Sequence, residues 1–246
     1  MGRLKNIVLG NLDGKVGNIV GRKRKGKYFV YAMPTEFNIS NSQEAIRSRN
    51  IMKPLAKFAS VVNSIPELKY IWTTDKLEAF DAFHKIEKVN YPYLSAERPT
   101  LKNTITPIGL IENPIQSGSI SESGILLNII FGEKNIKQLE GTKDLTGVGV
   151  VCYFNPYDKE PDYFRLGKIR TGTFDMQKDE PFEIDISFNE EERRKYNSYL
   201  QGILYFAFVS KDINGTPIKA TNSCSIEFAH EIVSEKERFK VCDSRP

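Results

Sequence analysis

The most constraining feature is the β-like texture that begins after Arg98-Pro99 and continues almost to the end of the chain. Short segments rich in aromatic and β-branched residues alternate there with turn-forming residues, a pattern typical of strands. Seven segments are predicted to be strands: Ile105–Ile111, Gly124–Phe131, Val148–Phe154, Phe164–Phe174, Phe182–Phe188, Ile203–Val209 and Ile218–Phe228. The polar segment Asn189–Tyr199 is predicted to form a short helix between two of them.

Seven short strands at this spacing favour two packed sheets. We therefore predict an antiparallel immunoglobulin-like β-sandwich over residues 103–232, followed by a C-terminal tail at 233–246. The last hairpin is expected at Asn214-Gly215, because this pair tolerates the positive φ of a tight turn. The Cys…Trp…Cys signature of antibody domains is absent, so the prediction depends on the number and spacing of the strands.

Residues 40–102 are predicted to be a helical segment. Ser40 and Gln43 fit a capping box, which places a helix start there. Apolar residues then follow at helical spacing, namely Ile46, Met52, Leu55, Ala59 and Val62. Pro54 is expected to kink this helix or to split it in two, because proline lacks the backbone N–H that a helix interior needs.

A second helix is predicted to begin at Asp75, since Glu78 three residues later completes a capping pattern. It should end before Asn90-Tyr91-Pro92 and carry an apolar face formed by Leu77, Phe80 and Phe83. Trp72 lies between the two predicted helices. We expect Trp72 to be a core anchor, because an indole ring buries a large apolar area.

Residues 1–39 are predicted to form a basic, glycine-rich β-arm. Glycines divide this segment into short apolar pieces with strand character, namely Ile7–Leu9, Val16–Val20 and Tyr28–Tyr31. A turn is expected at Leu12-Asp13-Gly14-Lys15, where Asp-Gly suits a tight hairpin. The arm, the helical segment and the sandwich together predict an α+β protein.

The composition is that of a folded protein without a membrane span. Of 246 residues, 40% are hydrophobic and 27% are charged, and the longest apolar run is Ile203–Val209. That run is far shorter than the roughly 18–20 residues that a membrane-spanning helix needs. Cys152, Cys224 and Cys242 form no CxxC pair. We therefore expect free thiols, no metal or other cofactor, and synthesis in the cytoplasm, with later release in a virion or other particle left open.

The net charge of +4 hides an asymmetry along the chain. Residues 1–102 contain 18 Lys and Arg against nine Asp and Glu, whereas residues 103–246 contain 17 against 22. These two parts therefore carry formal charges of +9 and −5. Opposite charges favour head-to-tail attraction between copies, and they equally permit the basic part to contact phosphate.

The densest cationic run is Gly21–Lys27, and it leads directly into the aromatic sequence Tyr28-Phe29-Val30-Tyr31. We predict that this stretch is an interface, in which the cations bind an acidic partner and the tyrosines act as aromatic anchors. The candidate interface residues are Arg22, Lys23, Arg24, Lys25, Lys27, Tyr28 and Tyr31. Nucleic-acid binding is the alternative, because the same side chains can contact phosphates and stack on bases.

The sequence contains no recognisable catalytic motif. Gly14-Lys15 lacks both the spacing and the following Ser or Thr of a phosphate-binding loop. No GxSxG or HExxH pattern accompanies the two histidines, His84 and His230. The acidic run Asp158–Asp162 lacks the Gly and the final Glu of a calcium-binding loop, so a solvated loop is predicted there. We therefore predict no catalytic residues and no enzymatic activity.

Short motifs are spread over most of the chain. They are GKVGNIVG at residues 14–21, Gln43 with Arg47-x-Arg49, Ala79-Phe80, the segment Leu204–Asp212 and Asn222-Ser223. Together they resemble an uncharacterised family of unknown function that is frequent in Bacteroidota. The chain departs from that family at Arg22-Lys23-Arg24, where a Trp-containing stretch is expected. The resemblance implies no assigned activity and no catalytic residues.

A β-arm followed by two helices and a sandwich also resembles structural subunits of phages or phage-tail-like particles. We therefore predict a non-enzymatic structural subunit of a multi-copy assembly, which contacts further copies of itself or other subunits through the basic arm. Nucleic-acid binding through the same arm stays open as the alternative. A surface- or carbohydrate-binding module is the third possibility, suggested only by analogy with other sandwiches.

Overall fold

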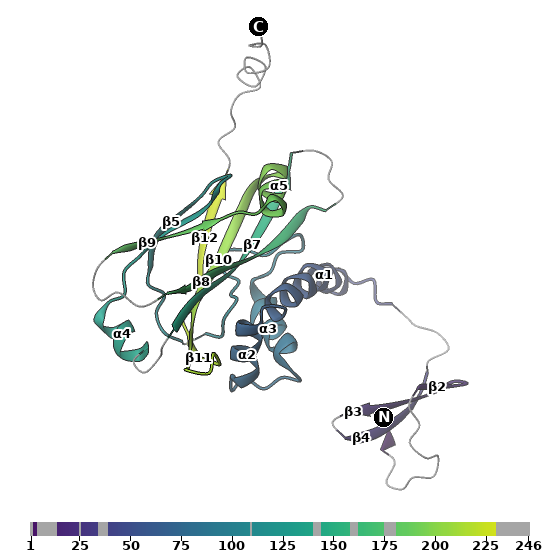
Figure 1. Ribbon diagram of the computed structural model, residues 1–246. Coiled ribbons are helices and arrows are strands. Elements are labelled where there is room, and N and C mark those ends of the chain that lie inside the picture. Colours follow the sequence, from purple (N-terminus) through teal and green to yellow (C-terminus); the bar gives the residue numbers. More distant parts are fainter. Residues whose placement is uncertain are drawn as a thin grey trace. The chain divides into compact units, whose positions relative to one another are not determined.

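The computed structural model describes residues 2–3, 14–24, 26–33, 39–108, 110–139, 144–157, 162–174 and 181–229 (Figure 1). The chain divides into two compact units, Met1–Ile46 and Arg47–Pro246, and the division falls inside the first helix. The predicted tail at 233–246, the apolar piece Ile7–Leu9 and residues 12–13 of the predicted turn lie outside the described residues.

The N-terminal unit contains a small antiparallel sheet with strand order β1-β4-β3-β2. Its strands are β1 (Gly2–Arg3), β2 (Gly14–Val16), β3 (Ile19–Arg24) and β4 (Lys27–Ala32). Val16 pairs with Ile19, so Gly17 and Asn18 form a two-residue turn in which the φ of Gly17 is +60°. The predicted strand Val16–Val20 is therefore wrong, because a turn residue with positive φ divides it in two.

Helix α1 (Gln43–Asn63) confirms the first predicted helix but differs from it at two points. Ser42 rather than Ser40 lies at its start, and the Ser42 Oγ accepts a hydrogen bond of 3.3 Å from the backbone N–H of Ala45. The helix also continues through Pro54, so the predicted split is wrong. Packing on both sides of the proline offsets the missing backbone hydrogen bond. The buried apolar residues are Ile51, Leu55, Phe58, Ala59 and Val62.

Two helices follow where one was predicted, α2 (Pro66–Thr74) and α3 (Ala82–Asn90), and a 3-10 turn, η1 (Tyr91–Tyr93), comes next. Asp75 caps the end of α2 rather than starting a helix, and α3 begins after Asp81, whose carboxylate accepts a hydrogen bond from the His84 backbone N–H. Trp72 is a core anchor as predicted, but it lies within α2. It is fully buried, and its Nε1 donates a 2.8 Å hydrogen bond to the carbonyl of Ile105.

The second unit contains two antiparallel sheets, so the described chain is α+β. The five-stranded sheet contains β7 (Asp144–Pro156), β8 (Phe164–Phe174), β10 (Tyr199–Lys211), β11 (Pro217–Ala220) and β12 (Cys224–Ala229). Its order is β11-β10-β7-β8, and β12 also pairs with β10. The three-stranded sheet has the order β5-β6-β9, formed by Ile115–Ile120, Gly124–Ile129 and Phe182–Ser187. Two short helices, α4 (Glu133–Leu139) and α5 (Glu190–Ser198), lie between strands.

Two of the seven strand predictions in the second unit need correction, and one strand was not predicted. The described residues of Ile105–Ile111 form a loop and not a strand. The Ile105 carbonyl accepts the Trp72 hydrogen bond, and Ile111 makes an isolated bridge to Thr221. The first strand of the second unit is instead β5, which the sequence analysis missed together with α4. Ile218–Phe228 consists of two strands that pair with different parts of β10, and the break lies at Thr221.

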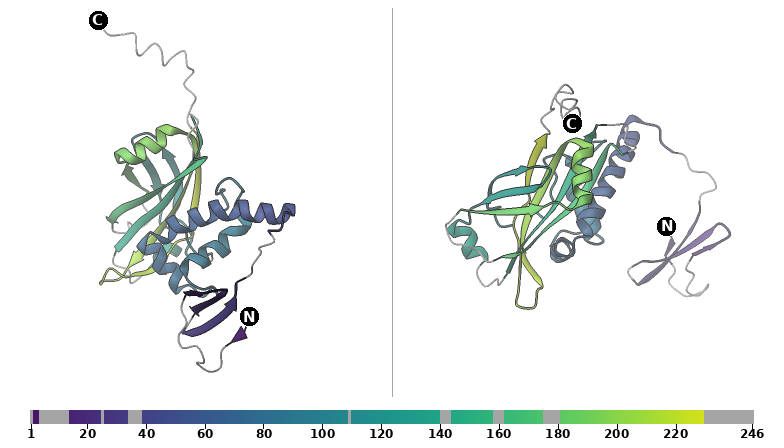
Figure 2. Two further views of the ribbon diagram at one scale, coloured as in Figure 1. Left: turned by 90° about the vertical axis from the view of Figure 1, so that its right-hand side faces the viewer. Right: turned by 45° about the horizontal axis from the view of Figure 1, so that its top comes forward.

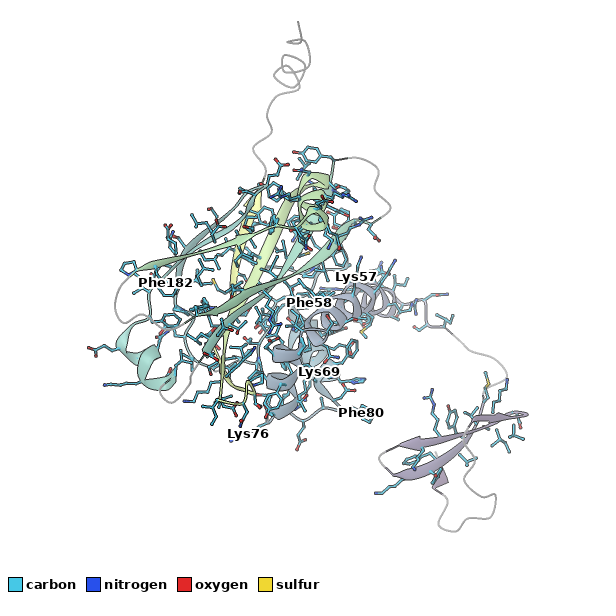
Figure 3. All side chains as sticks on the ribbon, in the orientation of Figure 1. Lys57, Phe58, Lys69, Lys76, Phe80 and Phe182 are labelled. Atoms are coloured by element: carbon cyan, nitrogen blue, oxygen red, sulfur yellow. The ribbon has the colours of Figure 1, made fainter. Side chains whose placement is uncertain are left out.

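The five-stranded sheet is covered on both faces, as the views in Figures 1 and 2 show. One face packs against α1, α2 and α3. The ring of Phe58, which is labelled in Figure 3, meets the Tyr205 ring edge to face there, with the ring centres 5.4 Å apart. The other face packs against the three-stranded sheet. Side chains alternate between these two cores along each strand, so β7 and β10 are buried almost throughout.

A buried carboxylate ties the helical layer to the five-stranded sheet. Glu67 on α2 is 4% exposed, and its Oε1 accepts hydrogen bonds from Lys211 Nζ at 3.0 Å and from Arg170 Nη2. Burial alone would raise the Glu67 pKa, but the hydrogen bond from Lys211 and the two positive charges bring this pKa below its ordinary value. The carboxylate is therefore charged in the folded protein near neutral pH.

Candidate interaction surface of the N-terminal sheet

The register of the N-terminal sheet sorts the predicted interface residues onto two faces. Residues directly opposite each other in an antiparallel pair share a face, and neighbours along one strand point to opposite faces. Arg22 pairs with Phe29 and Lys23 pairs with Tyr28. Arg22 and Lys23 therefore point to opposite sides of the sheet.

We call one side the cationic face. Its described side chains are Lys15, Val20, Arg22, Lys27, Phe29 and Tyr31. Lys15, Arg22 and Lys27 are exposed, whereas the two aromatic side chains are half-buried. This face thus presents charged groups around a partly covered apolar centre, a combination that suits an interface with an acidic partner.

The opposite face is mostly apolar. It carries Val16, Ile19, Lys23, Tyr28, Val30 and Ala32. Lys23 Nζ lies 5.4 Å from the centre of the Tyr28 ring, so the cation of this face is held over an aromatic ring. Val16 is 61% exposed, which makes the apolar character of this face accessible to solvent.

The predicted interface set is therefore divided rather than brought together. Arg22, Lys27 and Tyr31 share the cationic face, whereas Lys23 and Tyr28 lie on the other side. The Arg24 backbone pairs with Lys27 at the end of the hairpin. Lys25 lies outside the described residues.

Three members of the cationic face, Lys15, Val20 and Phe29, were not among the predicted interface residues. They can be identified in the sequence by counting from Arg22 across the two turns, because side chains alternate between the two faces of a strand and the turns fix which residues lie opposite each other. The four strands contain six Lys or Arg and no Asp or Glu. Among the described residues, Lys15, Arg22, Lys23 and Lys27 form no ion pair, so their charge is available to a partner.

The other candidate chemical groups are occupied within the fold or lie outside the described residues. The Nδ1 of His84 is 2.8 Å from the Asp81 carboxylate that caps α3. Asp162 lies 3.8 Å from Lys57 and 3.8 Å from Arg165. His230, Asp158 and Glu160 are among the residues that the structure does not describe.

The cysteines of the described chain are free, and burial raises the pKa of the Cys152 thiol to about 12. The described residues contain no cluster of three or more His, Cys, Asp or Glu side chains that could hold a metal ion. Within the same residues, no helix is both long and apolar enough to span a membrane. No protein-family model, curated protein or solved structure matches the chain.

Proposed function

We propose that this protein is a non-enzymatic structural subunit of a multi-copy assembly, of the kind found in virions or phage-tail-like particles. The observation that carries the proposal is the cationic face, which belongs to a separate compact unit and has no carboxylate in its strands. A face of this kind can dock on an acidic surface of a neighbouring subunit. Its charges would set the orientation of the contact, and its aromatic side chains would supply buried area.

The small size of the N-terminal sheet supports the proposal. A sheet of a few short strands gains independent stability only when one of its faces is covered. Val16 and Ile19 on the apolar face are 61% and 36% exposed, and the side chains of the cationic face are at most half-buried. Contact with another subunit would bury part of this surface and so stabilise the sheet.

The second unit supports an immunoglobulin-like sandwich through its strand order. If β5, β6 and β7 correspond to strands A, B and C, then β9, β10 and β12 take the places of E, F and G. The A-B-E order of the smaller sheet and the G-F-C order of the larger one then follow. Strand β8 lies beside C, and β11 is an addition. We propose this fold and, with it, the relationship to the Bacteroidota family that the short motifs resemble.

Nucleic-acid binding is the second candidate, and one observation favours it. Arg22 and Lys27 lie on the same face as Phe29 and Tyr31, so the sheet offers phosphate contacts beside rings that could stack on bases. In that case the contact would depend on phosphates and would be lost at high salt. A bound nucleic acid would also raise the ratio of absorbance at 260 nm to that at 280 nm.

Size-exclusion chromatography with light scattering on nuclease-treated protein separates these two functions. We expect a discrete species larger than the monomer at low salt, free of nucleic acid, which dissociates as the salt concentration rises. The variant Arg22→Glu/Lys27→Glu should be a monomer. The control Lys23→Glu/Lys53→Glu changes the net charge equally but leaves the cationic face intact, and it should assemble. A monomer that binds added DNA or RNA through Arg22 and Lys27 would instead establish the second candidate.

A further inference from the structure

The outer face of the three-stranded sheet has the opposite charge to the N-terminal sheet. Its strands have the sequences IQSGSI, GILLNI and FEIDIS, which contain two carboxylates and no Lys or Arg. Ile184 and Ile186 belong to the core between the sheets, so Glu183 and Asp185 point outward, and both are exposed. We call this outward side of β5, β6 and β9 the acidic face.

We propose that the acidic face is the docking site for the cationic face of a second copy of this chain. The inference depends on the proposed function, and it identifies the surface to which the N-terminal sheet binds. The chain carries both charged faces, one with cations and no carboxylates in its strands and one with carboxylates and no cations. A second copy therefore supplies the complementary surface without any other partner.

The distance between the two carboxylate residues of the acidic face is close to the distance between the two cationic residues of the cationic face. Glu183 and Asp185 are two residues apart on one face of β9, which separates their Cα atoms by about 6.6–6.8 Å. Arg22 lies opposite Phe29, and Lys27 is two residues from Phe29 on β4. Arg22 and Lys27 are therefore diagonal neighbours, about 7–8 Å apart. Two ion pairs can form at once across such a contact.

Apolar side chains flank the charges in matching positions. On the acidic face Asp185 lies opposite Leu126, which is 37% exposed although it is a large apolar residue. On the cationic face Arg22 lies opposite the half-buried Phe29. Placing Arg22 against Asp185 would bring Phe29 toward Leu126, so the contact would bury apolar area beside the ion pair.

One cation near the acidic face is already paired with a carboxylate of the same chain. A groove of about 470 Å³ runs between β8 and β9 beside Glu183 and Asp185, and Arg170 is among the residues that line it. The Arg170 guanidinium is bound to the Glu67 carboxylate. Phe182, which is labelled in Figure 3, lies at the start of β9 and also lines this groove.

A contact between two different faces repeats from copy to copy. Such a heterologous contact generates a ring where the rotation closes and an open filament where it does not. A contact of this kind can build a multi-copy assembly from one interface, whereas a single isologous contact gives only a dimer.

Charge reversal of the acidic face tests the proposal. We expect the full-length variant Glu183→Lys/Asp185→Lys to weaken self-association about tenfold or more at low salt, as measured by light scattering over a concentration series. The control Glu78→Lys/Glu97→Lys changes the net charge equally at exposed residues in the connections that follow α2 and η1, and it should associate like the wild type. Circular dichroism and thermal unfolding show whether each variant folds.

A second variant distinguishes docking from a general effect of charge. The combination Arg22→Glu/Lys27→Glu/Glu183→Lys/Asp185→Lys exchanges the charges of the two faces, and we expect it to recover the association that each pair of changes removes. Arg22→Glu/Lys27→Glu could associate more weakly than the wild type while Glu183→Lys/Asp185→Lys associates like its control. The docking site would then lie elsewhere, and the proposed function would stand. A wild-type monomer at every salt concentration would contradict both.

Discussion

Removing the charge of Glu67 should destabilise the second unit strongly, because the carboxylate is almost inaccessible and forms ion pairs with two cations. Its side chain is 5% exposed, and that of Lys211, its partner at 3.0 Å, is 13% exposed. Glu67→Gln keeps the shape of the side chain but leaves Lys211 without a counter-charge. Loss of one partner of a buried ion pair costs about 3–5 kcal/mol. The Arg170 side chain is 59% exposed and regains water, so we expect about 2–3 kcal/mol here.

Urea unfolding at pH 7 of four proteins measures this effect. They are the wild type, Glu67→Gln, Lys211→Met and the double variant. The double variant should lose less free energy of unfolding than the sum of the two single changes, since removing both charges leaves neither one buried and unpaired. A Glu67→Gln variant within about 0.5 kcal/mol of the wild type, or strictly additive changes, would refute the reasoning.

The difference in free energy of unfolding between the wild type and Glu67→Gln should depend on pH and shrink in acid. The Glu67 pKa is lower in the folded protein than its ordinary value of 4.5. The stabilisation from its charge is therefore fully present above about pH 4.5 and is lost as the pH falls through the folded pKa. The difference in free energy of unfolding between the wild type and Glu67→Gln should be constant from pH 6 to 8 and should shrink on acidification below pH 4.5.

Three further predictions concern other parts of the second unit. A Cβ atom on Gly167 would lie 2.2 Å from the Glu192 carboxylate, which accepts hydrogen bonds from Tyr153 and Lys195. Gly167→Ala should therefore lower the free energy of unfolding in urea by about 1–3 kcal/mol. An unchanged unfolding midpoint would show that the Glu192 side chain moves away at no cost. Asp81→Ala removes the cap of α3 and should cost about 0.5–2 kcal/mol, which thermal unfolding would detect. Cys152 is buried, and burial raises the pKa of its thiol to about 12, so a thiol reagent should modify Cys152 only in the unfolded protein. Rapid labelling of Cys152 in the native protein, located by mass spectrometry of peptides, would contradict its burial.

Sequence patterns predicted the elements whose local signal and tertiary environment agree. Strand β8 has the predicted bounds, Phe164–Phe174, and α5 lies within the predicted segment Asn189–Tyr199. In α1 the predicted apolar residues Leu55, Ala59 and Val62 are buried, whereas Ile46 and Met52 are exposed. The effect of Pro54 was decided by the packing on either side of it. The proline rule describes a local cost, and a buried apolar face of several turns can outweigh that cost.

The missed elements had signals that tertiary contacts were needed to interpret. Pro66 at the first turn of α2 is a regular helix-start signal, yet the region around Trp72 was predicted to lie between two helices, the second of which was expected to start only at Asp75. Helix α4, by contrast, is only seven residues long and has little periodicity to detect. In segment Ile105–Ile111 the Ile105 side chain is buried in the core and its carbonyl accepts the Trp72 hydrogen bond, so an apolar residue there indicates a buried loop and not a strand.

For the candidate surface, the composition of the sequence predicted which charges are present, but the strand register decides where they lie. The run from Arg22 to Lys27 was visible in the sequence, but one residue of register decides which face each side chain takes. That register is fixed by the turn at Gly17-Asn18 and by the pairing of Arg24 with Lys27. As a result Lys15 lies on the same face as Arg22, whereas Lys23 lies on the opposite face. On β9 the same alternation turns Glu183 and Asp185 outward because the intervening Ile184 packs inward. Local turn chemistry and core packing thus determine which charges can meet, whereas composition determines only that opposite charges are present.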